Sequence, residues 1–314
     1  MSLIIDSVSK RFGDVQALDS VSLEINPGEV FGFLGANGAG KTTAMRIVLD
    51  ILRPDSGTIT WNGTPNTELP RETWGYLPEE RGLYAKMNVL EQLVFFAKLH
   101  GVKPKDAERE TREWLDRFRI PEYADMRAEQ LSKGNQQKIQ FIAAILHDPQ
   151  VLLMDEPFSG LDPVNVALLK EAFLEMKNRG KTLVFSTHQM ETVEELCESI
   201  AILDRGRVVV AGTVRDVRRS TGRQMVRVAV EGDSEMAWLG TIDGVRVTRR
   251  GQDYTEAEVA PGHDPGAVLQ AALGRACKVR HFEMTDPSLE QIFIEHVGQI
   301  DVSERTLAPR AARA

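Results

Sequence analysis

The sequence predicts an α/β fold with a parallel sheet, followed by a smaller α+β domain. Short apolar runs without polar alternation stand at Val30–Leu34, Val151–Met154 and Thr182–Ser186. Such runs are typical of strands that are buried on both faces. Between them, apolar residues recur at helical spacing, as in the stretch Ile139–Leu146. This alternation of strand and helix, sustained over residues 1–215, indicates a parallel sheet.

Local signals place the elements of the first domain in order. Pro27-Gly28 precedes the first buried strand, and a helix is expected from Lys41 to Leu52. Pro163 marks a helix start, because its fixed φ suits the first helical turn, and Gly180 marks the end of that helix. The stretch Ile200–Val210 is typical of a hairpin that turns at Arg205-Gly206.

The domain boundaries follow changes in composition. We expect the first domain to span residues 1–215, with a charge-rich helical lobe inserted at about 86–148. A basic, polar stretch at 216–222 is expected to be a linker. Residues 223–300, with two alternating strands and two helical stretches, are expected to form an α+β domain. The tail 301–314 is rich in Ala and Arg, and we expect it to be disordered.

Charge and composition exclude several classes of protein. There are 38 Lys and Arg residues against 46 Asp and Glu residues, which gives a net charge of −8. This balance argues against a nucleic-acid-binding protein, because a basic excess supplies most of that affinity. Two cysteines are too few for a disulfide framework and indicate thiols in a reducing compartment. We expect neither a signal peptide nor a membrane-spanning helix, since no apolar run reaches 18 residues.

A glycine-rich loop predicts a nucleotide phosphate site. Residues 35–42, GANGAGKT, match the pattern G-x-x-x-x-G-K-[ST] between an expected strand and helix. Glycines let backbone N–H groups surround an anion, and the helix N-terminus adds partial positive charge. Lys41 is expected to reach the β- and γ-phosphates, and the Thr42 hydroxyl to bind Mg²⁺. The residues expected to bind ATP are Gly35, Asn37, Gly38, Ala39, Gly40, Lys41, Thr42 and Thr43.

An acidic pair follows the second buried strand. Asp155 stands at the carboxyl end of Val151–Met154, where a hard Mg²⁺ ion beside the phosphate loop prefers an oxygen ligand. Glu156 is the next residue and is expected to point to the other side of the strand, because strand side chains alternate. It is therefore free to polarise a water that attacks the γ-phosphate. This division of roles favours a hydrolase over a kinase.

These motifs together resemble the ATP-binding cassette (ABC) ATPases over residues 2 to about 215. The diagnostic stretch is Leu131–Lys138, LSKGNQQK, which is similar to the LSGGQ signature of that family. The resemblance implies a P-loop NTPase core with an antiparallel β subdomain and a helical subdomain. In the family, the signature contacts the γ-phosphate of ATP that a second subunit holds. The residues that match it here are Ser132, Lys133, Gly134 and Asn135, and an expected helix N-terminus suits an anion.

Other family positions match in order. Phe12 resembles the aromatic residue that stacks on adenine, and His188 resembles the histidine that contacts the γ-phosphate. Asp162, in SGLD, resembles the loop that crosses the dimer interface. The sequence departs from the family at Lys133 and Asn135, and also at Glu79, where the family usually has Gln. A Glu79 carboxylate can still bind Mg²⁺ or hold a water, but it changes the charge of the site.

The resemblance implies a mechanism and partners. Two copies, or this chain and a homologous ATPase subunit, would close on two Mg·ATP, with Glu156 orienting water and His188 stabilising the developing charge. The motion would pass to separate integral membrane permease subunits, so the chain would be cytoplasmic and peripheral on the inner face of the membrane. The stretch 79–87, which includes Arg81 and Tyr84, is the expected contact. The pattern is most similar to bacterial exporters, and residues 287–293 are similar to their C-terminal accessory domain.

Two other classes stay open. One is a non-hydrolysing regulatory subunit that binds ATP and docks on a partner. The departures at Lys133, Asn135 and Glu79 favour it, whereas the intact Lys41, Asp155, Glu156 and His188 argue against it. The other is a soluble ABC-type ATPase that acts on ribosomes or DNA. The single cassette and the acidic balance argue against the second class. No N-K-x-D element for guanine is present, which argues against a GTPase.

Overall fold

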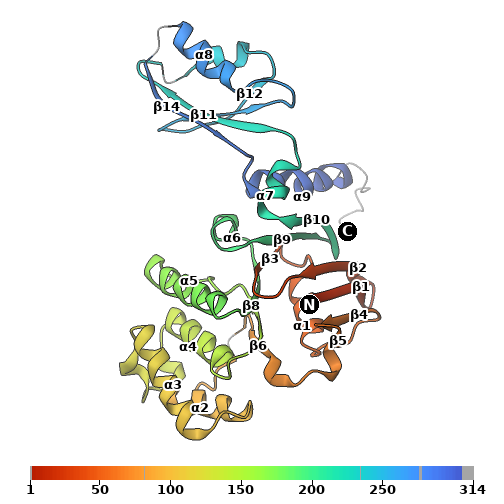
Figure 1. The fold of residues 1–314 in the computed structure, drawn as a ribbon, viewed down its shortest axis with the longest axis vertical. Helices are drawn as coiled ribbons and strands as arrows, with labels where there is room; N and C mark the ends of the chain where they lie inside the picture. Colours follow the sequence, from red (N-terminus) through yellow and green to blue (C-terminus); the bar gives the residue numbers. More distant parts are fainter. Residues whose placement is uncertain (1, 81, 234, 276–277, 306–314) are drawn as a thin grey trace, which may run out of the picture. The chain divides into compact units, whose positions relative to one another are not determined.

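The computed structural model describes residues 2–80, 82–233, 235–275 and 278–305 (Figure 1). The chain forms two compact units, which divide between Thr213 and Val214. Each unit has a hydrophobic core of its own. Among the described residues, no helix is both long and apolar enough to cross a membrane.

An antiparallel sheet opens the first unit. Its strand order is β2-β1-β4-β5, with bounds β1 (Leu3–Phe12), β2 (Val15–Ile25), β4 (Ser56–Trp61) and β5 (Thr64–Pro65). Along β1 and β2, buried residues such as Ile5 and Leu23 alternate with exposed ones, so that one face packs on the core. The expected antiparallel subdomain is therefore confirmed.

The second sheet is the parallel sheet that the buried runs predict. Its order is β10-β9-β3-β8-β7-β6, with bounds β3 (Val30–Leu34), β6 (Trp74–Leu77), β7 (Val151–Asp155), β8 (Thr182–Thr187), β9 (Ser199–Asp204) and β10 (Arg207–Thr213). Only β10 is antiparallel to its neighbour. Every residue of β3, β7 and β8 is buried. Because these three strands are adjacent and parallel, their carboxyl ends meet at one edge of the sheet.

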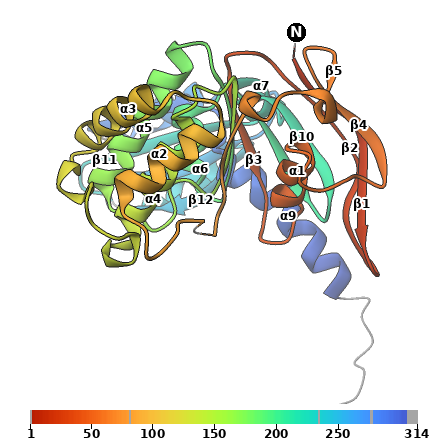
Figure 2. The ribbon, with the colours of Figure 1, turned by 90° about the horizontal axis from the view of Figure 1, so that it is seen from below.

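Helices cover this sheet and form the inserted lobe. They are α1 (Lys41–Val48), α2 (Val89–Leu99), α3 (Pro104–Arg117), α4 (Lys133–Ile145), α5 (Pro163–Asn178) and α6 (Met190–Leu196). Short 3-10 helices η1 (Asn66–Glu68) and η2 (Arg71–Thr73) lie between β5 and β6, and η3 (Pro121–Tyr123) and η4 (Ala128–Gln130) lie between α3 and α4. Helices α2, α3 and α4 lie together, away from β1, β2 and β4 (Figure 2).

Aromatic packing joins the lobe to the parallel sheet. The ring of Phe141 on α4 lies 5.8 Å from that of Phe173 on α5. Phe173 in turn packs edge-on against Phe185 of β8 at 5.6 Å. Such pairs contribute about 0.5–1.5 kcal/mol each beyond the area that they bury. This chain of contacts fixes α4, whose N-terminus carries the signature residues, against the strand that precedes His188.

The second unit begins at Val214, so the first unit ends two residues before the expected residue 215. Its sheet has the order β12-β13-β11-β14, and its elements are α7 (Val214–Arg219), β11 (Gln224–Val230), η5 (Ala237–Thr241), β12 (Val245–Arg250), β13 (Thr255–Val259), α8 (Gly266–Gly274), β14 (Val279–Thr285) and α9 (Leu289–Arg305). Much of the segment expected as a linker is helix α7, because Val217 is buried and Arg218 bonds the Pro287 carbonyl. Of the expected tail, residues 301–305 belong to α9, and residues 306–314 lie outside the described residues.

Candidate active site

The glycine loop closes around the Lys41 ammonium group. It runs from the end of β3 to the start of α1, and Lys41 Nζ donates hydrogen bonds to Gly35 O at 2.8 Å and Ala36 O at 3.1 Å. Gly38 and Gly40 have φ values of 82° and 109°. These values favour glycine because a Cβ is strained in this region. The loop therefore needs its glycines for a tight turn, and it presents backbone N–H groups at a helix N-terminus.

The β1–β2 hairpin packs beside this loop. A Cβ on Gly40 would lie 2.5 Å from Ala17 O, which shows how closely β2 approaches. Phe12 ends β1, and its side chain is 48% exposed, with Lys10 Nζ 5.6 Å from the ring centroid. An exposed aromatic ring at this position offers a flat apolar surface to a base. Asn37 is also exposed in the loop, whereas Ala39 is buried, and Thr43 on α1 is half-buried.

Burial and charge act in opposite directions on Lys41. Burial lowers the pKa of its ammonium group, and the carboxylates of Glu156, Asp155 and Glu79 partly offset this effect. Three acids thus lie within electrostatic reach of one buried cation. Glu79 itself is exposed, beyond the end of β6. A phosphate group at the loop would meet both this cation and a local excess of carboxylates, which a divalent cation is suited to neutralise.

Thr42 and Asp155 form an oxygen pair that fits Mg²⁺. Thr42 Oγ1 donates to Asp155 Oδ2 at 2.5 Å, and Ser186 Oγ donates to Asp155 Oδ1. Asp155 ends β7 and is 1% exposed. Within the described residues, no three His, Cys, Asp or Glu side chains group closely enough to hold a metal ion. Mg²⁺ commonly binds through one or two protein oxygens together with phosphates and waters, so this donor set fits it.

Glu156 and His188 contact each other just after the ends of two adjacent strands, β7 and β8. Glu156 follows β7 with φ of 49°, and its N–H donates to Ser186 O at 3.2 Å and Ser186 Oγ at 3.1 Å. Its carboxylate is 8% exposed and lies 3.0 Å from Nδ1 of His188, whose side chain is 63% exposed. The left-handed backbone at Glu156 costs about 1–2 kcal/mol, which its hydrogen bonds to Ser186 offset. A buried carboxylate in contact with an exposed imidazole can hold a water and shuttle a proton.

The signature residues form a second group on α4 and α5. Ser132 caps α4, because its side chain accepts a hydrogen bond from Asn135 N at 3.3 Å. Asp162 caps α5 in the same way, through Asn165 N at 3.0 Å, and these bonds lower the pKa of Asp162. Gly134, in the first turn of α4, lies close to the start of α5, since a Cβ on Gly134 would be 3.5 Å from Leu161 Cδ2. Lys133 and Ser132 are exposed, which leaves this helix N-terminus open to an anion.

The structure thus places the expected residues in two groups. Lys41, Thr42, Asp155, Glu156 and His188 meet at the carboxyl edge of β3, β7 and β8. The hydrogen bonds of Ser132 and Asp162 remain within their own helix N-termini.

Sequence reasoning missed the residues that support the first group. Ser186 bonds both Asp155 and Glu156, and a hydroxyl near the end of a buried apolar strand is the signal that could have revealed it. The side chains of Asn66 and Arg71 donate to the carbonyls of Ile47 and Leu49. They bind the end of α1, which stops at Val48 instead of the expected Leu52. Sequence patterns carry no signal for such distant caps.

Comparisons with known proteins agree with this geometry. Residues 18–159 match a family model described as ABC transporter. Residues 212–297 match the C-terminal domain of the DrrA1-3-like ATP-binding proteins. An uncharacterized ABC transporter ATP-binding protein, YhaQ of Bacillus subtilis, is 46% identical over 95% of this chain and 99% of its own length.

Two further relatives extend the comparison. The linearmycin resistance ATP-binding protein LnrL of the same organism is 29% identical over 94% of this chain and 97% of its own length. A solved structure of the ATP-binding subunit of an ABC transporter superposes with a TM-score of 0.66 at 32% identity, covering 71% of this chain and 94% of that one. The chain therefore belongs to the ABC transporter ATP-binding protein family.

Proposed function

We propose that this chain hydrolyses ATP to power an exporter whose membrane-spanning subunits are separate polypeptides. The observation that carries the proposal is the contact between buried Glu156 and exposed His188 beside the Thr42–Asp155 pair. A subunit that only bound ATP would not need a buried carboxylate next to the metal ligands. The name of a further relative, the Nod factor export ATP-binding protein I of Sinorhizobium fredii, supports the exporter assignment. On this proposal, the chain is peripheral on the inner face of the membrane.

Each residue then has a role in hydrolysis. Backbone N–H groups from Gly35 to Lys41 and the Lys41 ammonium group bind the β- and γ-phosphates, and Thr42 and Asp155 hold Mg²⁺. The metal supplies neutralisation of the charge that develops on the phosphates. Glu156 accepts a proton from the attacking water, and His188 holds that carboxylate in position through its Nδ1 contact. Phe12 stacks on adenine.

A second subunit completes the site. Ser132, Gly134 and the first turn of α4 would contact the γ-phosphate of ATP that the partner holds. Loss of that phosphate removes the group that bridges the two subunits, so they separate. Ser132 and Lys133 are exposed, which supports this arrangement, because an anion from another chain can reach them.

Glu156→Gln tests the chemistry. The amide keeps the shape of the side chain but cannot accept the proton, so the turnover rate should fall by roughly 10²–10⁴. ATP affinity should stay within a few-fold, and size-exclusion chromatography with Mg·ATP should show a stable dimer. The matched control is Glu171→Gln, an exposed carboxylate on α5. Near-normal turnover of Glu156→Gln would remove Glu156 from its role.

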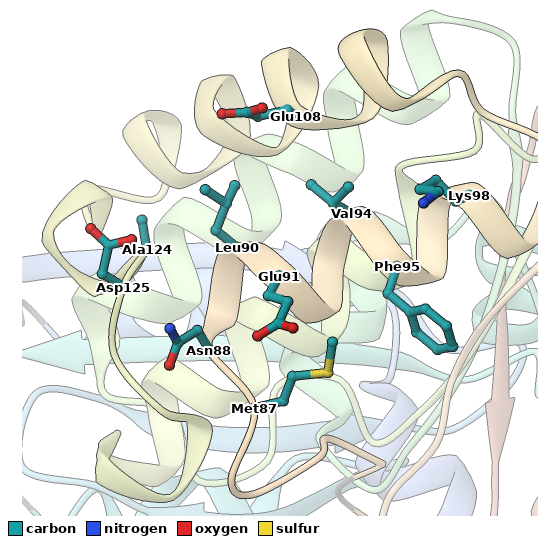
Figure 3. A pocket seen from close by; sticks show the side chains of 10 residues that line it. All are labelled: Met87, Asn88, Leu90, Glu91, Val94, Phe95, Lys98, Glu108, Ala124 and Asp125. Carbon is teal, nitrogen blue, oxygen red and sulfur yellow. The ribbon is translucent and has the colours of Figure 1, made fainter.

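The surface that meets the permease is proposed at the pocket between α2 and α3. This pocket of about 420 Å³ is lined by the residues drawn in Figure 3, which include Glu91, Glu108, Asp125 and Lys98. Glu108 is paired with Arg112, but Glu91 and Asp125 still exceed the single ammonium of Lys98, which favours a basic segment as the occupant. Next to it, the ring of Tyr84 is stacked on that of Phe96 at 5.7 Å and is 54% exposed. We therefore assign to this surface a cytoplasmic segment of the permease that carries basic and apolar side chains.

Tyr84→Ala tests this surface. It should weaken co-purification with the permease, while the ATPase activity of the isolated chain stays unchanged. Leu99→Ala, which removes an exposed apolar side chain at the end of α2, is the control. Equal recovery of the permease with both variants would contradict the assignment. Arg81, which the sequence also places in this contact, lies outside the described residues.

A further inference from the structure

Two buried glutamines on α4 reach out of the helix to separate loops. Gln137 Nε2 donates to Pro157 O at 3.1 Å, and Gln140 Nε2 donates to Glu80 O at 3.2 Å. The two residues are three positions apart, so they lie on the same face of the helix. Their side chains are 5% and 4% exposed. One face of α4 is thus fastened to two loops through polar side chains.

Burying a glutamine amide costs free energy when any of its polar atoms is left without a hydrogen-bond partner. An unpaired buried polar atom costs about 1–3 kcal/mol, and Gln140 Oε1 is buried without a hydrogen-bond partner. Residues beside them on α4, such as Ile139, Phe141 and Ile142, are apolar and fully buried. Apolar side chains would satisfy the packing alone. The amides therefore point to a need for directed bonds at these two positions.

The two loops are those that follow Glu156 and Glu79 in the chain. Pro157 is the residue after Glu156, so the bond from Gln137 to its carbonyl holds the chain one peptide beyond Glu156, whose own N–H bonds Ser186. Glu80 is the residue after Glu79, which acts electrostatically on Lys41. The same helix begins at Ser132 and Gly134. A shift of α4 is therefore transmitted to both loops.

We infer that Gln137 and Gln140 are positioning residues, which couple the signature end of α4 to Glu156 and Glu79. The inference rests on the proposed function, since it assigns to these residues an effect on hydrolysis. Gln137 holds Glu156 where it can accept a proton from water. Gln140 holds the loop that places Glu79 near Lys41. Both side chains are buried and bond backbone carbonyls, so they are assigned no contact with the nucleotide.

Gln137→Met is the first test, in the purified full-length chain. Methionine has a similar volume but cannot donate to Pro157 O. The turnover rate should fall about 10- to 100-fold, the size of effect expected from a small misplacement of a reacting group. The dissociation constant for a non-hydrolysable ATP analogue should stay within twofold, because Lys41, Thr42 and Asp155 are unchanged. Gln137→Asn, whose shorter amide cannot reach the carbonyl, should give the same result and serves if the first variant does not fold.

Double variants separate positioning from a structural role. In the Glu156→Gln background, Gln137→Met should cause no further loss, because it acts through Glu156. Gln140→Met should also lower turnover, and it should lose this effect in the Glu79→Gln background. Gln92→Met is the matched control and should leave turnover within twofold. Gln92 is also a buried glutamine that donates to a backbone carbonyl, that of Met87, on a helix away from the catalytic acids.

The outcomes are distinct for the two proposals. If the wild-type chain hydrolyses ATP and Gln137→Met turns over normally, the inference is wrong and the proposed function stands. Effects that multiply in the double variants also overturn the inference, because they indicate a structural role. A wild-type chain that binds ATP without hydrolysing it overturns the proposed function and the inference together.

Discussion

Gly38 and Gly40 in the phosphate loop differ in what surrounds them. Both have positive φ, but a Cβ on Gly38 would meet nothing within 4 Å, whereas one on Gly40 would lie 2.5 Å from Ala17 O and 2.8 Å from Leu18 Cδ2. Gly38→Ala should therefore cost only the backbone strain, about 1–2 kcal/mol. Gly40→Ala adds overpacking against β2 of about 1–3 kcal/mol.

Thermal unfolding of the nucleotide-free chain measures this difference. The Gly40→Ala variant should unfold several degrees below the Gly38→Ala variant, because 1 kcal/mol shifts the midpoint by about 2–4 °C in a domain of this size. Measurement without nucleotide keeps any effect on phosphate binding out of the comparison. Equal midpoints for the two variants would show that β2 yields to a methyl group at Gly40.

At the residue scale, sequence patterns indicate the residues whose structural setting is local. The positions of Lys41 and Asp155 follow from a loop motif and from the end of a buried strand, and the structure brings both to one sheet edge. Sequence reasoning failed for Ser186, Gln137 and Gln140. Each of these side chains forms a hydrogen bond with a residue at least 20 positions away in the chain. No sequence periodicity indicates such a partner.

At the scale of elements, buried apolar runs predicted the strands well, whereas a polar segment gave no sign of its helix. The strands β3, β7 and β8 begin and end within a residue of the expected runs. Helix α7 was missed because its sequence is basic and polar, and only Val217 is buried. Its arginines bond the chain just after β14, where Arg218 donates to the carbonyls of Asp286 and Pro287. Tertiary contacts of this kind override local propensity.

A pair of stacked histidines joins two elements of the helical lobe to the sheet. The rings of His100, after α2, and His147, after α4, are 4.0 Å apart, and His147 Nε2 lies 2.9 Å from Trp74 O of β6. Burial lowers the pKa of His147 to about 4, which its hydrogen bond to Trp74 only partly offsets. Burial also lowers the pKa of His100. The nearby charged groups that act on the pair are Glu72 and Asp148.

The His147 pKa predicts a pH dependence of stability. The unfolded chain binds a proton at His147 below about pH 6.5, whereas the folded chain does so only near pH 4, so stability falls as the pH drops through this window. Between pH 7.5 and pH 5 the loss at this one site should be about 2 kcal/mol. His147→Gln keeps a donor for the Trp74 carbonyl but does not titrate, and urea unfolding should show a correspondingly weaker pH dependence. His281→Gln, an exposed histidine of the second unit, should leave the dependence unchanged.

On the scale of the whole molecule, the two units were foreseeable from composition, and the exact division was not. The basic stretch after residue 215 marked a change of unit, but polar residues that form a helix and polar residues that form a linker look alike in sequence. The core of the second unit is a separate set of side chains, among them Val226, Val228, Trp238 and Leu239. The first unit has its own core around Phe33 and Val184.

Separate cores predict separate responses to core mutations. Leu239→Ala removes a fully buried side chain of the second unit and should destabilise that unit by about 2–5 kcal/mol. ATP affinity should remain within twofold, because the phosphate loop draws its support from β2, β3 and α1. Phe33→Ala, the matched change in the first core, should cost about 3–5 kcal/mol and reduce the fraction of chain that binds ATP. Calorimetry should resolve two transitions, of which each variant lowers a different one. A single transition that both variants lower equally would mean that the two cores unfold together.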